Sequence, residues 1–184
     1  MRRTIASLGL VLLAAACTGP APAASGPAPS GGSPSQGASS PDARRIGIYA
    51  AAFRALAETE RWFDPILLDE RICPRVADPM AETGGACRER FTEEEQAAIL
   101  ERLADLGTVR FVPDGEGAMR RIFRGDLRGA GLLTVGPIEG DGSRVEVAGR
   151  AYCGVLCAHW MTWVVERTPA GWEVTGTTGP VAIS

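Results

Sequence analysis

The sequence predicts an α+β domain in which two N-terminal helices pack on an antiparallel β-meander of about four to six strands. Two observations support this class. Apolar residues recur every three or four positions in the first half of the folded region, whereas short alternating runs separated by turn residues fill the second half. Helices that precede strands in this way cover one face of a sheet. With 45% hydrophobic and 22% charged residues among 184, the composition is ordinary for a globular protein.

The first predicted element is a helix that runs to about Glu60. Ser40, Pro41 and Asp42 are typical of a helix start, with an N-cap followed by proline at the first helical position. Apolar side chains then recur at spacings of three and four residues: Ile46, Tyr49, Ala50, Phe53, Leu56 and Ala57. This spacing predicts an amphipathic helix that turns one face toward the core.

A short strand and a loop are expected after this helix. Pro65 breaks the helical pattern, and the apolar run that begins at Ile66 predicts a strand toward Cys73. The residues that follow, 74–90, are polar and contain glycine, which is typical of a loop.

The second predicted helix begins at a capping box. The Thr92 side chain is expected to accept from the amide of Glu95, while the Glu95 carboxylate reaches back to the amide of Thr92. The helix continues through a further set of apolar residues and closes at Gly107. A strand over 109–112 is expected to follow, ended by a Pro-Asp-Gly sequence.

The last part of the chain predicts an antiparallel meander. Turn sequences, such as those at 140–142 and 168–171, separate short alternating runs. The expected strands cover 132–138, 144–152, 159–167 and 172–175.

The N-terminus has the order of features found in a bacterial lipoprotein signal peptide. A short positive segment, 1–3, precedes about 13 mostly apolar or small residues, which are too few to span a bilayer as a helix. Three alanines then precede Cys17. This arrangement resembles a lipobox and predicts that residues 1–16 are removed, that Cys17 carries acyl chains, and that the protein is extracytoplasmic and anchored to the bacterial membrane.

A flexible tether is expected between the anchor and the domain. Residues 17–41 consist largely of Pro, Gly, Ser and Ala and contain no charged residue. Such a segment cannot bury enough apolar surface to offset the entropy of ordering it. The remaining residues, 42–184, are then one α+β domain.

The charge balance argues against nucleic acid as a partner. The formal net charge is −3, and removing residues 1–16 takes away two arginines and makes it −5. An acidic chain gains no general attraction to nucleic acid or to an anionic membrane surface. Attachment to the membrane is therefore expected to depend on the acyl chains.

Four cysteines remain if Cys17 is lipidated. Outside the cytoplasm an even number of cysteines usually forms disulfides, and four allow three connectivities. Proximity in sequence favours Cys73 with Cys87 and Cys153 with Cys157. The second pair requires a tight loop at Gly154, because three intervening residues in an extended strand would hold the two cysteines too far apart.

Cys153, Cys157 and His159 also suggest an alternative, a metal or thiol-redox module. The spacing matches no common zinc module and no fourth ligand is evident. No cofactor or metal is therefore expected. As the only histidine, His159 is also the residue on which a neutral-pH general base would depend.

Three further sets of residues have both a functional and a structural interpretation. The functional interpretations are a set of carboxylates for acid–base chemistry, a cluster of arginines that binds an anion, and a cluster of tryptophans that lines a pocket. We favour the structural interpretations, in which the acids and the arginines are solvated surface residues and the tryptophans pack in the core. The sets are Asp64, Asp69 and Glu70; Arg120, Arg121, Arg124 and Arg128; and Trp160, Trp163 and Trp172.

The C-terminal region, 151–184, resembles a group of uncharacterised, largely actinobacterial exported lipoproteins. The shared pattern begins with the Tyr-Cys-Gly of 152–154, and its other elements are Leu156-Cys157, Glu166-Arg167, Gly171-Trp172, Val174 and Ile183-Ser184. The resemblance implies no catalytic residue. The order of helices and strands is also similar to cystatin-like and nuclear-transport-factor-like folds, which include both enzymes and binding proteins.

We therefore expect a lipid-anchored extracytoplasmic domain that is not an enzyme and that binds an envelope protein or a small ligand. His159, Trp160 and Trp163 are the candidate pocket residues, and no catalytic residue is assigned. The alternatives are a pocket enzyme that uses His159 or a carboxylate, and the metal or redox module at Cys153, Cys157 and His159.

Overall fold

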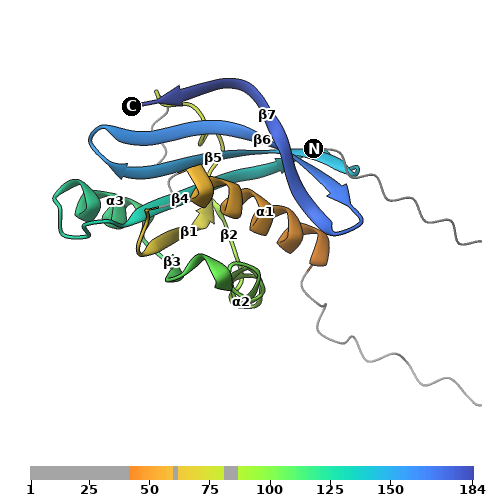
Figure 1. Cartoon of the computed structure of the whole chain (residues 1–184), viewed down its shortest axis with the longest axis horizontal. Helices are drawn as coiled ribbons and strands as arrows, with labels where there is room; N and C mark the ends of the chain where they lie inside the picture. Colours follow the sequence, from red (N-terminus) through yellow and green to blue (C-terminus); the bar gives the residue numbers. More distant parts are fainter. Residues whose placement is uncertain (1–41, 60–61, 81–86) are drawn as a thin grey trace, which may run out of the picture. The chain divides into compact units, whose positions relative to one another are not determined.

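The structure is a computed structural model that describes residues 42–59, 62–80 and 87–184 (Figure 1). The predicted signal peptide, Cys17 and the tether lie outside the described residues, as do Ser40 and Pro41. The described helices are α1 (Ala43–Thr59), α2 (Glu93–Arg102), the 3-10 helix η1 (Ala104–Leu106) and α3 (Gly115–Phe123). The strands are β1 (Ile66–Ile72), β2 (Glu89–Arg90), β3 (Val109–Val112), β4 (Gly131–Glu139), β5 (Arg144–Gly154), β6 (Cys157–Thr168) and β7 (Gly171–Ile183).

The predicted α+β class is confirmed, with one seven-stranded sheet that is mostly antiparallel. Its order is β2-β1-β4-β5-β6-β7, and β3 lies beside β1 along the same edge as β2. The predicted meander corresponds to β4–β7. The four strands of this meander agree with the predicted four to six, but the whole sheet is not a meander, because β1 pairs in parallel with both β3 and β4. Parallel strands need a long crossover connection, and here α2 lies in the connection from β1 to β3 and α3 in the connection from β3 to β4.

The main core lies between α1 and one face of the sheet. The largest fully buried side chains include Tyr49, Phe53 and Leu56 of α1 and Leu68 and Leu133 of the sheet. The structure differs from a one-sided amphipathic helix, because every residue from 46 to 50 is buried. The reason is β7, which bends across α1 (Figure 1) and brings Trp172 against Gly47. A β-carbon on Gly47 would lie 2.7 Å from Cδ1 of Trp172, so this contact requires glycine.

The start of α1 and the start of α2 are both capped by side chains. Asp42 caps α1 among the described residues: its Oδ1 accepts from the amide of Arg44 at 2.9 Å. The predicted capping box of α2 is confirmed, with both reciprocal hydrogen bonds present. Arg45 joins the two helices, since its Nε donates to Glu95 Oε1 at 2.7 Å.

The third helix, α3, covers the opposite face of the sheet. Ala118 and Ile122, one turn apart, pack on Leu67 and Leu132 to form a second, smaller core. The sequence indicated only a short element with one buried side here. Asp114, expected to end a strand, instead starts the helix by accepting from the amide of Gly117 at 2.8 Å.

Both predicted cysteine pairs lie at disulfide distance. The Cα–Cα distances are 4.3 Å for Cys73 and Cys87 and 5.2 Å for Cys153 and Cys157. The second pair forms as expected, because Gly154 adopts a positive φ of 150° and begins a tight hairpin tip. In the second pair, each cysteine sulfur that the metal-site alternative requires as a ligand is bonded to the other. No group of three potential metal ligands occurs within the described ranges.

None of the described helices is both long and apolar enough to cross a bilayer.

Candidate functional site

The three predicted pocket residues do not converge on one site. His159, Trp160 and Trp163 all lie on β6, where they pair with Ala151, Arg150 and Val147 of β5. Directly paired residues share a face of the sheet, and successive residues alternate between faces. His159 and Trp163 therefore lie on the face that α1 covers, whereas Trp160 lies on the other.

The candidate carboxylates are also separated. Asp69 and Glu70 are successive residues of β1 and point to opposite faces, and Glu70 pairs with Arg90. Asp64 precedes the strand, where its backbone amide donates to Gly129. No acid–base pair forms among these three residues.

Asp69 is instead the centre of a buried charge cluster beside the start of α3. It is 2% exposed, and Arg71 donates to it from Nε at 3.1 Å and from Nη2 at 3.0 Å. Burial lowers the pKa of the nearby Arg150, against the opposing attraction of Asp69. Gly115 makes room for the carboxylate, because a β-carbon there would lie 1.9 Å from Oδ2. The cluster is a structural ion-pair network beneath α3.

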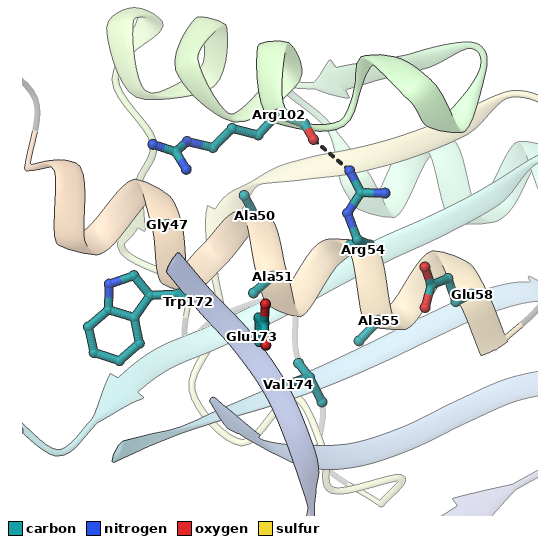
Figure 2. Close-up of a pocket in the computed structure, with 10 residues that line it drawn as sticks. All are labelled: Gly47, Ala50, Ala51, Arg54, Ala55, Glu58, Arg102, Trp172, Glu173 and Val174. Atoms are coloured by element: carbon teal, nitrogen blue, oxygen red, sulfur yellow. Dashed lines mark hydrogen bonds between the residues drawn. The ribbon is translucent and has the colours of Figure 1, made fainter. Parts of the chain in front are cut away.

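The larger of two described pockets lies between α1, the end of α2 and the beginning of β7 (Figure 2). Its volume is about 540 Å³. The helix contributes one face, with residues spaced three and four apart, and the strand contributes three successive residues. The lining residues are Gly47, Ala50, Ala51, Arg54, Ala55, Glu58, Arg102, Trp172, Glu173 and Val174.

The floor of the pocket exists because four α1 residues that line it are small: Gly47, Ala50, Ala51 and Ala55. Large side chains at these positions would fill the space beneath β7. Trp172 closes one end, where its ring packs against Gly47 and lies 5.5 Å from the Arg44 guanidinium. Of the three tryptophans grouped by sequence, only Trp172 lines this pocket.

Two arginines define the side of the pocket formed by α2. Arg54, on α1, donates to both carboxylate oxygens of Asp105 at 2.8 and 2.7 Å and to the backbone carbonyl of Arg102 at 2.7 Å. Hydrogen bonding to Asp105 raises the Arg54 pKa and keeps the guanidinium charged. These bonds fix the end of α2 above the pocket.

The Arg102 side chain is exposed and extends over the pocket (Figure 2). Among the described residues no ion pair to its guanidinium is found. Glu58 lies toward the other end of the same α1 face, where the Arg54 guanidinium is its neighbour, and Glu173 of β7 lies between the two ends (Figure 2).

Sequence reasoning missed this pocket because it depends on the path of β7. The one available signal was the run of small residues on one side of the first helix, at the spacing of a single helical face. That signal alone also fits close packing against another element.

A smaller hollow of about 240 Å³ lies beside α3. Of the predicted arginine cluster only Arg121 lines it, together with Arg110 and Asp114. Arg120 pairs with Asp114 and Glu116, and Arg124 pairs with Asp126. The cluster therefore does not converge on one anion site.

Comparisons of the chain with protein-family models, with curated proteins and with solved structures find no match.

Proposed function

We propose that this protein is a lipid-anchored extracytoplasmic binding protein and that the pocket between α1, α2 and β7 takes a ligand bearing a carboxylate. The Arg102 guanidinium carries this proposal, because it stands over the pocket with no counter-ion among the described residues. A carboxylate accepts well-directed, charge-assisted hydrogen bonds from guanidinium. The apolar floor and Trp172 would hold the rest of the ligand.

Binding is favoured over catalysis because the residues of the enzyme alternative lie elsewhere. His159 does not line the pocket, and the buried Asp69 is bound to Arg71. The two carboxylates that do line it, Glu58 and Glu173, are exposed.

Replacing Arg102 with Gln tests the ligand class. A displayed library of random pentapeptides with free C-terminal carboxylates serves as the probe, since peptides supply both a carboxylate and apolar side chains. We expect wild type to select binders, and R102Q to bind them about 10- to 100-fold more weakly, the value of a charged hydrogen bond of about 1.5–3 kcal/mol.

The matched control is Arg128→Gln, an exposed arginine outside the pocket, which should bind like wild type. Amidating the peptide C-terminus should weaken binding to wild type and leave the residual binding of R102Q unchanged. Equal affinity of R102Q and wild type for the selected acids would refute the carboxylate site.

The anchor is a proposal that rests on the order of features before Cys17, which resembles a lipobox. A Cys17→Ala variant should leave the membrane fraction and appear in the soluble extracytoplasmic fraction or the medium, because it has no acyl chains. Detergent partitioning of the wild type is the positive control. A variant that stays with the membrane through high salt and mild alkali would rule out anchoring at Cys17.

A further inference from the structure

We propose that the ligand is an extended peptide segment that adds as a strand to the free edge of β7, in the groove against α1. This inference rests on the proposed binding function and specifies its partner class. Strand addition requires unpaired backbone groups at an open sheet edge, with pockets beside it for side chains. The beginning of β7 meets both requirements.

The direction of the backbone groups on β6 follows from hydrogen bonds at its two ends. The amide of Arg167 donates to the Ser143 carbonyl at 2.7 Å, on the β5 side. At the other end, Ala158 and Ser184 exchange two hydrogen bonds, of 3.2 and 3.0 Å, on the β7 side. Since backbone groups alternate along a strand, odd-numbered residues of β6 face β5 and even-numbered residues face β7.

The residues of β7 that pair with odd-numbered residues of β6 must then point their own backbone groups outward. Trp172 pairs with Arg167, and Val174 pairs with Val165. In an antiparallel ladder such pairs exchange no hydrogen bond, so the N–H and C=O of Trp172 and Val174 face the free edge. Within the described chain neither residue has another backbone hydrogen bond there.

This open edge borders the pocket. A pocket on one face of a strand would contact alternate residues, but three successive residues, Trp172, Glu173 and Val174, line this one. The pocket therefore lies along the edge of β7. An incoming strand would find two donors and two acceptors on one side and the small-residue face of α1 on the other.

The rest of the β7 edge is unsuited to pairing. The ladder with β6 is irregular between Val174 and Gly176, and again near the C-terminal end. There Gly179 has a φ of 70° and Pro180 has no amide hydrogen. Strand addition is thus confined to the part of the edge that lines the pocket.

β7 crosses α1 (Figure 2), so a segment paired with the beginning of β7 lies across the helix and not along it. Such a segment passes over the small residues of α1 that line the pocket, and the exposed Arg102 guanidinium is the group available there for a carboxylate.

The experiment uses the pentapeptides selected on wild type, each also made with a single N-methyl group at successive amides. Strand addition predicts losses of tenfold or more at alternate positions only, because every second amide faces β7. Val174→Pro should bind the unmethylated peptides at least tenfold more weakly, since it removes one outward donor. Edge strands accept proline at such positions, so the fold should be retained.

Thr177→Pro is the matched control. Thr177 pairs with Trp163, an odd-numbered residue of β6, so its amide also faces outward, but it lies outside the pocket. T177P should bind like wild type. Losses without a two-residue period, together with normal binding by V174P, would overturn strand addition while leaving the carboxylate site intact if R102Q still binds weakly. A two-residue period and weak binding by V174P would support strand addition whatever R102Q does.

Discussion

Replacing Asp69 with Asn is expected to lower the free energy of unfolding by about 3–5 kcal/mol, because removing one partner of a buried ion pair leaves the other charge uncompensated. Asp69 is 2% exposed and accepts two side-chain hydrogen bonds from Arg71. Its charge also attracts Arg150, whose pKa is lowered by burial. The variant would therefore leave two arginines near an uncharged amide.

Urea unfolding followed by tryptophan fluorescence measures this loss. The matched control is Asp105→Asn, which removes the same charge from an exposed pair with Arg54 and should cost much less. A change in D69N no larger than that in D105N would contradict a central role for the buried pair. An unchanged m-value, the slope of the unfolding free energy against urea concentration, would show that the variant unfolds through the same transition.

Much of the fold follows from local patterns in the sequence. The capping box at Thr92 and Glu95 and the alternating residues of β5 act within a few positions, so propensity and periodicity reveal them. The tight tip at Gly154 follows from the geometry that pairing of Cys153 and Cys157 imposes.

The elements that were missed depend on contacts between distant residues. The expected last strand ended at Thr175, whereas β7 continues to Ile183 through a segment rich in glycine and threonine that contains Pro180. Pairing with β6 overrides the weak strand propensity of these residues. The β7 residues that line the pocket, 172–174, lie inside the predicted strand, but the position of that strand over α1 depends on contacts between distant residues such as Trp172 and Gly47.

One error could have been avoided from the sequence alone. His159 and Trp160 are neighbours in a predicted strand, and neighbours point to opposite faces. A pocket built from His159, Trp160 and Trp163 was therefore inconsistent with the strand on which they were placed. The helix α3 was harder to find, since Gly115 and Gly117 weaken its propensity and it depends on packing over Leu67.

Removing the disulfide between Cys73 and Cys87 is also expected to lower the free energy of unfolding by a large amount. A double alanine variant is expected to lose about 3 kcal/mol of unfolding free energy, the chain-entropy value for a closed loop of about 15 residues. Cys73 is buried directly after β1, and its amide donates to the Val135 carbonyl at 2.9 Å. The bridge thus ties the loop that buries Val76 to the centre of the sheet.

The pair Cys153 and Cys157 provides the internal comparison, because it closes only about five residues and should contribute about 2 kcal/mol. Reduction of both would remove about 5 kcal/mol, which equals the whole stability of a marginal domain. Thermal melts of the two double variants, with and without reductant, measure the order of the two effects. Non-reducing peptide mapping checks the connectivity. Four free thiols in the native protein, or equal melting temperatures with and without reductant, would contradict the stabilising role of these bridges.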